Sequence, residues 1–372
     1  TLARAGQYAE ATAAYERALR VNQVNEGLYN LDQIRIRDGL SEGYLGLRDL
    51  DKANFHQEAQ VRVTARKVGS DSASLAPALY KLGRWYDRSG QPERARFVYQ
   101  KAARLIEAEK GAGSPDLIEA LLAMGDTYKA QALLPPDPNS SESPLGLLPL
   151  SSAMYRRALA IIDKQDPPTP ELRARAYVSL GDLYMLWSRR TTAEQAYGKA
   201  WQALTGDPAL EDTREGYFTT PVRLMGTEPP RLYPRSAAVR PPADASRLLP
   251  GTVVVGYAVE PSGRAVDVRV LESDPPGLID DAVLVAVRNS LYRPRYEDGK
   301  PVRADGQLYR HEFRYQESRL QPKPVEIPDG GRIEEPGATP LPQPPAGTDA
   351  TPAAGASPPA TDPDVLPPPP GP

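Results

Sequence analysis

Apolar and small residues recur along the first 206 residues with a period of 42. Tyr44, Tyr86 and Tyr128 are spaced by this period, and Tyr184 follows 56 residues later. Two further sets of positions keep the same rhythm: Ala11, Ala53, Ala95, Ser151 and Ala193, and Tyr15, Gln57, Tyr99, Tyr155 and Tyr197. Three sets with one period predict an all-α array of stacked helical hairpins.

The interval of 56 residues equals one period plus an insertion of 14. Tyr128 and Tyr155 are 27 residues apart, whereas the equivalent pair Tyr86 and Tyr99 is 13 apart. The insertion therefore lies between two helices of one unit, at about residues 133–150, where proline and serine are frequent. That composition predicts a loop.

Each unit combines a Leu-Gly pair, a tyrosine three residues later and, after a turn, an Ala-aromatic-Ala pattern. One unit carries the whole pattern: Leu82, Gly83, Tyr86, Gly90, Ala95, Tyr99 and Ala102. The small residues let two helices cross closely while the aromatic rings fill the space between them. The pattern resembles the tetratricopeptide repeat in a 42-residue form. The first unit shows only its second helix, residues 7–21, so we expect further chain upstream of Thr1.

In tetratricopeptide arrays the first helices of successive units line a concave groove that binds peptides. The resemblance implies a groove formed by Tyr80, Arg84, Asp87, Arg88, Glu119, Asp126, Lys129, Arg175 and Asp182. The alternative interpretation is an ordinary solvated helix face. The lysine and asparagine clamp that some family members use for C-terminal carboxylates is not evident, which disfavours a chaperone adaptor of that type.

A different pattern begins after residue 207. Alternating apolar and polar residues at 252–259 and 265–271, joined by a Pro-Ser-Gly turn, predict a β-hairpin. Residues 278–291 predict an amphipathic helix, and 308–315 a last strand. The predicted buried stripe of that helix consists of Leu278, Ala282, Val285 and Ala286.

The predicted domains are therefore a helical solenoid at 1–206, a linker at 207–216, a small α+β domain at 217–318 and a proline-rich tail at 319–372. The tail is too poor in apolar residues to form a core, so we expect it to be disordered. We also expect residues 217–318 to fold as an isolated fragment.

Several motifs in residues 217–318 resemble the C-terminal domain of TonB energy transducers. These are Tyr233-Pro234, Gly251, Asp281 to Val287, Tyr292-Arg293-Pro294, Gly299-Lys300-Pro301-Val302 and Phe313. Three features depart from that family. Pro241-Pro242 replaces an expected short helix, Pro230 stands where the family contacts its transporter, and the proline-rich segment follows the domain instead of preceding it.

In the TonB family the last strand has an open edge that captures an extended segment of an outer-membrane transporter by strand addition. The resemblance implies partner-binding residues along that strand and near the Tyr-Pro motif. They are Leu308, Tyr309, Arg310, His311, Phe313 and Tyr315 on the strand, and Leu232, Tyr233 and Pro234 near the motif. The alternative for the aromatic side chains is that they cover the helix.

Composition narrows the possible chemistry. The net charge is −3, so no bulk attraction to nucleic acid is expected. The chain has no cysteine and two histidines, His56 and His311, which are far apart in sequence, so we expect no metal site. No phosphate-binding glycine loop or nucleophile motif is present. We expect no catalytic centre, no cofactor and no small-molecule substrate.

These features predict a non-enzymatic protein-interaction adaptor in the periplasm or envelope of a Gram-negative bacterium. The resemblance implies two protein partners: an outer-membrane transporter segment and, through an anchor upstream of Thr1, an inner-membrane motor for energy-coupled transport. The first alternative is an envelope scaffold that keeps the fold without transducing energy. The second is a cytoplasmic adaptor built from the repeats alone.

Overall fold

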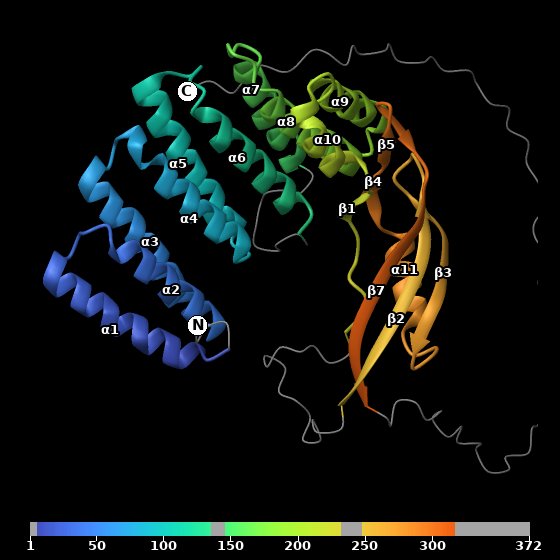
Figure 1. Cartoon of the computed structure of the whole chain (residues 1–372), viewed down its shortest axis with the longest axis horizontal. Helices are drawn as coiled ribbons and strands as arrows, with labels where there is room; N and C mark the ends of the chain where they lie inside the picture. The colour runs from blue at the N-terminus through green and yellow to red at the C-terminus, as the bar shows by residue number, and fades with distance from the viewer. Residues whose placement is uncertain (1–5, 135–145, 232–247, 317–372) are drawn as a thin grey trace, which may run out of the picture. The chain divides into compact units, whose positions relative to one another are not determined.

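The computed structural model describes residues 6–134, 146–231 and 248–316 (Figure 1). Most of the predicted insertion loop, the Tyr-Pro motif with Leu232, Tyr233 and Pro234, and all of the tail at 319–372 fall on residues outside these ranges. The remaining predictions can be compared with the structure directly.

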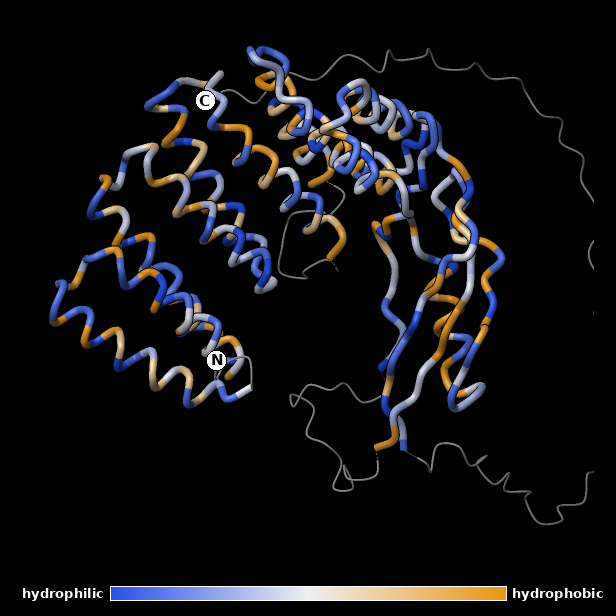
Figure 2. The backbone as a smooth tube through the Cα atoms, in the orientation of Figure 1, coloured by the Kyte–Doolittle hydropathy of each residue, from blue (hydrophilic) through white to orange (hydrophobic). Residues whose placement is uncertain are grey.

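The N-terminal part is a series of antiparallel helical hairpins, as the 42-residue period predicts. The α-helices are α1 (Tyr8–Glu26), α2 (Gln33–Gly46), α3 (Leu50–Val68), α4 (Ala76–Arg88), α5 (Pro92–Lys110), α6 (Leu117–Ala132), α7 (Leu147–Ile162), α8 (Pro170–Leu186) and α9 (Arg190–Ala203). Hydrophobic and hydrophilic stretches alternate along them (Figure 2). Their apolar sides form one continuous core.

Glycine and tyrosine residues of the repeat pattern are in direct contact inside three hairpins. A Cβ atom on Gly83, Gly125 or Gly181 would lie 2.3–2.5 Å from the ring of the tyrosine on the following helix. For Gly181 that tyrosine is Tyr197, which is fully buried. The glycines are therefore required by the close helix approach, as the sequence pattern indicates.

Short helices follow the array where the sequence predicted a linker. A 3₁₀ turn, η4 (Pro208–Leu210), leads into α10 (Glu211–Phe218), so the predicted domain boundary at residue 217 lies inside a helix. Phe218 is 1% exposed and belongs to the core of the array. The chain then enters the strand β1 (Val222–Met225).

The C-terminal part is built on a three-stranded antiparallel sheet of order β3-β2-β7. The long strands are β2 (Leu248–Val259), β3 (Ala265–Asp274) and β7 (Ala304–Gln316), with α11 (Asp280–Arg288) packed mainly against β3. Figure 1 shows β2 running between β3 and β7. Two small antiparallel pairs complete this part: β1 with β4 (Leu291–Arg293), and β5 (Arg295–Glu297) with β6 (Lys300–Val302).

The predicted helix stripe is partly wrong. Helix α11 ends at Arg288, and Leu291 begins β4 instead of ending the helix. Val285 is 50% exposed, whereas Val283 and Val287 are buried with the sheet. The helix therefore packs on the sheet through a face that is rotated from the predicted one.

Candidate protein-binding edge and repeat groove

Strand β7 pairs with β2 along one edge, and within the described residues no strand pairs with its other edge. The register runs from Leu248 opposite Gln316 to Val259 opposite Ala304. Over this length alternate backbone N–H and C=O groups of β7 point away from β2. Such a row of groups is a ready template for another extended chain.

The side chains of β7 divide between two faces of the sheet. His311, Phe313 and Tyr315 are buried on the face that α11 covers, and Tyr309 is half-buried beside them. His311 stacks between Tyr309 and Phe313, with centroid distances of 6.3 Å on both sides. These rings therefore complete the core of the sheet domain, as the alternative interpretation of the aromatic side chains expects, and their role in partner binding stays a prediction.

The opposite face of β7 is open. Leu308 is 65% exposed, and Arg310 lies in one row with Val254 of β2 and Glu272 of β3. The Arg310 and Glu272 side chains are 3.9 Å apart. A shallow hollow of about 220 Å³ lies beside Leu308, where the side chain of Leu271 packs over Gly256. Of the predicted strand residues, Leu308 and Arg310 are therefore the ones whose side chains a partner can reach.

The segment that follows β1 contacts the aromatic face of β7. The Tyr309 hydroxyl lies 3.4 Å from the Glu228 carboxylate, and His311 Nε2 lies 3.2 Å from the Pro230 carbonyl. Arg223 stacks over the Tyr309 ring at 5.8 Å. Pro230, the departure noted from the sequence, thus lies against the strand through its backbone carbonyl.

Most residues of the predicted repeat groove already have partners in the array. Arg88 pairs with Glu42 at 2.5 Å, and Lys129 pairs with Asp126 at 3.1 Å. Tyr80 donates to the carbonyl of Asp116 at 3.0 Å. Arg84 is exposed and has no ion-pair partner within the described residues. The Arg88–Glu42 pair is exposed to solvent and the Lys129–Asp126 pair is partly exposed, and a surface ion pair stabilises a fold by about 0–1 kcal/mol.

Asp182 is not available as a groove residue. Its side chain is 11% exposed and accepts two hydrogen bonds from Arg293 of β4, Nε–Oδ1 and Nη2–Oδ2, both at 2.9 Å. The Tyr197 hydroxyl also donates to Oδ1 at 2.7 Å. The groove assignment for Asp182 is therefore corrected, because this carboxylate joins the last repeat to the sheet domain.

Arg293 is surrounded by groups that stabilise its charge. Its Nη1 donates to the Tyr217 carbonyl at 3.0 Å, and its guanidinium lies about 6 Å from the rings of Tyr197 and Tyr217. Burial disfavours the charge, but the Asp182 carboxylate outweighs burial and the pKa of Arg293 is raised. A fragment that begins at residue 217 would remove Asp182, which argues against the expectation that residues 217–318 fold alone.

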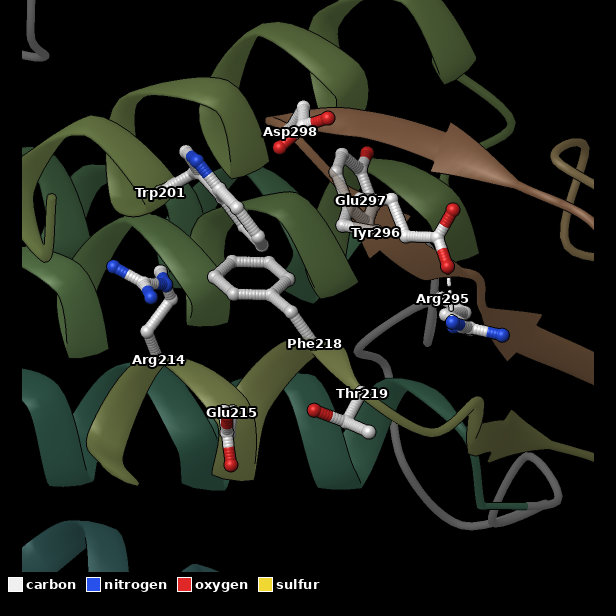
Figure 3. A pocket seen from close by; sticks show the side chains of 9 residues that line it. All are labelled: Trp201, Arg214, Glu215, Phe218, Thr219, Arg295, Tyr296, Glu297 and Asp298. Carbon is white, nitrogen blue, oxygen red and sulfur yellow. Dashed lines mark hydrogen bonds and ion pairs between the residues drawn. The ribbon is translucent and has the colours of Figure 1, made fainter. Parts of the chain in front are cut away.

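A cavity of about 380 Å³ lies beside this junction (Figure 3). Its apolar wall consists of Trp201, Phe218 and Tyr296, with the Phe218 ring 5.4 Å from Trp201 and 5.2 Å from Tyr296. Arg214 already lies over the Trp201 ring at 5.3 Å. Tyr296 is 3% exposed and packs with the array, so the two parts share one core at this point.

Comparisons with known proteins agree with this architecture. Residues 232–314 match the family model described as the Gram-negative bacterial TonB protein C-terminal, and residues 76–109 match a tetratricopeptide repeat model. The chain carries a TonB C-terminal domain behind tetratricopeptide repeats. Both are typically non-catalytic protein-interaction modules, and the TonB domain indicates a Gram-negative envelope protein.

Two solved structures are similar to part of this chain. BtubC (BKLC) from P. vanneervenii is 18% identical, and the alignment covers 63% of this chain and 84% of that chain with a TM-score of 0.40. A Podosopora anserina putative kinesin light chain with nearly identical TPR-like repeats is 15% identical, with 54% and 89% covered and a TM-score of 0.40. No curated protein matches the sequence.

Residues at the junction between the repeats and the TonB domain were missed as functional residues. Arg293 belongs to the Tyr-Arg-Pro motif of the TonB domain, and nothing in the local sequence indicates that its partner is Asp182, 111 residues earlier. A signal did exist for the β5–β6 hairpin: Asp298 and Gly299 both have positive φ angles, as expected of an Asp-Gly hairpin turn. That turn positions Tyr296.

In the described parts of the TonB domain and the repeats, no group of three or more His, Asp or Glu side chains is placed to hold a metal ion. No helix within residues 6–134, 146–231 and 248–316 is long and apolar enough to cross a bilayer.

Proposed function

We propose that this protein is a non-catalytic envelope adaptor that binds an extended segment of an outer-membrane partner by strand addition on β7. The observation that carries the proposal is the sheet order β3-β2-β7, which leaves one edge of β7 unpaired within the described residues. A strand added there makes main-chain hydrogen bonds of about 0.5–1.5 kcal/mol each. Five such bonds are enough for a transient complex.

Side-chain selectivity would come from the open face of the sheet. Leu308 and the hollow beside it offer apolar contact, and Arg310 offers a positive charge beside the added strand. The buried rings of His311 and Phe313 contribute by keeping β7 flat against the core. We therefore expect the bound segment to be extended, with an apolar residue near Leu308 and an acidic residue near Arg310.

Two proline variants of the full chain test strand addition. Consecutive strand residues direct their N–H groups to opposite edges of the strand. Of the two variants Leu308→Pro and Tyr309→Pro, one therefore removes an N–H group that points to the open edge, and the other removes an N–H group that points to β2. Peptides selected from a displayed library against the wild-type chain serve as the probe. We expect the variant that loses the outward donor to bind at least about tenfold more weakly while its helical circular dichroism is unchanged. Equal binding by both variants and the wild type would exclude the β7 edge.

The repeat groove is proposed as the site of a second protein partner. Among the predicted groove residues, Arg84 is exposed and has no ion-pair partner in the described part of the chain, and the pairs around it are weak enough to be exchanged for contacts with a peptide. Arg84→Glu should weaken a groove-binding peptide, whereas Lys101→Glu on α5 should leave it unchanged. If both variants bind equally well, the groove is an ordinary solvated face.

Coupling to energy-driven transport is the further part of this proposal. The alternative function is that of an envelope scaffold with a TonB fold that transmits no force. The shared core at Tyr296 and the buried Arg293–Asp182 pair support a fixed connection between the two parts, which suits either function. The codons upstream of Thr1 discriminate between them: an apolar membrane span favours force transmission, and a cleavable signal or lipidation site favours the scaffold.

A further inference from the structure

The four tyrosines that are spaced by the repeat period each contact a polar residue of the preceding unit. In every case this residue lies 28 positions earlier in the sequence. The Tyr44 hydroxyl donates to Glu16, and the Tyr86 hydroxyl donates to Glu58 at 2.7 Å. In these two units the residue at this position is therefore an acid. The carboxylate lies between the second helix of one unit and the first helix of the next, and it accepts a hydrogen bond from the phenolic hydroxyl.

A basic residue stands eight residues after each of these tyrosines, close to the tyrosine ring. Lys52 lies 5.1 Å from the centre of the Tyr44 ring, and Arg94 lies 5.7 Å from the centre of the Tyr86 ring. Arg94 is also within 3.8 Å of the Glu58 carboxylate. In the Tyr86 unit the base therefore compensates the charge of the acid, whereas Lys52 is ion-paired with Asp49. In the next unit the position holds the neutral Gln100, whose amide lies 3.5 Å from the Tyr128 hydroxyl.

The last unit reverses the charge at this position. Arg156 of α7 occupies the place of Glu16 and Glu58, and its Nη2 donates to the Tyr184 hydroxyl at 2.9 Å. The position eight residues after Tyr184 is Thr192, which brings no charge. Arg156 is therefore hydrogen-bonded to a neutral hydroxyl, whereas Glu58 in the earlier unit also faces the charged Arg94.

A cavity of about 350 Å³ lies at this reversed position, between α7, α8 and α9. Arg156 and Lys199 both line it, and neither has a carboxylate partner within the described residues. Lys199 lies 5.5 Å from the centre of the Tyr177 ring. Asp163, the acid of the lining, is already ion-paired with Arg173 at 3.1 Å.

We propose that this cavity binds a carboxylate of an acidic partner peptide. The carboxylate would supply the counter-charge that Arg94 supplies to Glu58 in the earlier unit, with the signs reversed, accepting hydrogen bonds from Arg156 and charge compensation from Lys199. The Tyr184 hydroxyl accepts from Arg156 and keeps its own proton, which it can donate to the same ligand. Leu159 and Leu180 in the wall contact the aliphatic part of the peptide side chain. This site is separate from the β7 edge and from the groove around Arg84.

The test is a titration of the full chain with short peptides at low salt. The probes are tetraglutamate with blocked ends, tetraglutamine with blocked ends, and tetraglutamine with a free C-terminal carboxylate. We expect blocked tetraglutamate to bind and blocked tetraglutamine not to bind. The third probe distinguishes a terminal carboxylate from a side-chain carboxylate as the natural source. Raising the salt to about 0.5 M should weaken binding, because the contact is between charges near the surface.

Three variants localise the binding. Arg156→Glu restores the acid of the earlier units, so we expect this variant to fold normally and to lose binding of tetraglutamate. Lys199→Gln should weaken binding by about tenfold, the effect of one charge-assisted contact. Lys101→Gln removes a cation of α5 that does not line the cavity and should leave binding unchanged. Equal affinity of tetraglutamate for the wild type and Arg156→Glu, or equal binding of blocked tetraglutamine, would overturn the proposal.

Discussion

Arg293 of the TonB domain and Asp182 of the last repeat, 111 residues apart in sequence, form a buried bidentate ion pair with both N–O distances at 2.9 Å. Burial makes the pair sensitive to the loss of either partner, since the remaining charge cannot be solvated. The pair therefore joins the array and the sheet domain as parts of one folded unit, rather than as independent domains on a linker.

Removing one partner of this pair should destabilise the whole chain. We expect Asp182→Asn to lower the free energy of unfolding by about 3–5 kcal/mol, because Arg293 stays buried without a counter-charge. Combining it with Arg293→Gln should cost less than the sum of the two single changes. Urea denaturation of the four proteins gives the coupling energy. Arg175→Gln, which breaks the exposed pair with Glu119, is the control and should change stability by about 1 kcal/mol or less.

Stability should fall on mild acidification because of His56. Burial and the nearby Arg37 guanidinium lower the pKa of His56 to about 4, and Arg37 Nη1 lies 3.3 Å from its Nδ1. In the unfolded chain the pKa is about 6.5, so the unfolded state binds more protons between these values. Stability is therefore full above about pH 6.5 and is lost as the pH falls towards 4, by about 1.4 kcal/mol for each unit of pH.

The measurement is the denaturation midpoint of the wild type and of His56→Gln between pH 7 and pH 5. Carboxylates change little in this range, so the wild type should lose stability while the variant stays nearly constant. A wild-type slope that persists in His56→Gln would show that another group titrates.

The Gly–Tyr contacts predict opposite effects for two glycine substitutions. Gly181→Ala places a Cβ atom 2.4 Å from the Tyr197 ring, so we expect a loss of about 1–3 kcal/mol from overpacking. Gly198→Ala lies in α9 with open space around it, and there alanine should stabilise the helix by about 0.5–1 kcal/mol. Thermal denaturation of both variants measures these changes in stability. Destabilisation by Gly198→Ala would contradict the open space around Gly198.

Amide hydrogen exchange tests the free edge of β7 without any partner. We expect the N–H groups of β7 that face β2 to be protected and the alternate ones to exchange rapidly. Addition of a strand-forming peptide should slow the second set. Uniform protection of β7 in the free protein would mean that another part of the chain covers the edge, and strand addition would then require its displacement.

The sequence by itself determined the repeat array and the sheet domain, because both depend on local periodicity. The 42-residue spacing requires helices that cross at glycine, and Gly83, Gly125 and Gly181 do meet tyrosine rings. Alternation at 252–259 and 265–271 requires strands, and β2 and β3 contain these residues. Such patterns report which residues share a face of one element.

Only the tertiary structure decided which face each element buries and which distant groups meet. His311 and Phe313 alternate with polar residues along β7, a pattern that does not say which face of the strand is buried. Their rings are buried because α11 and the Pro230 segment pack on that face. The partner of Asp182 is likewise unpredictable from its own neighbours: a charge can be buried only where an opposite charge meets it, and Arg293 arrives there from the sheet domain.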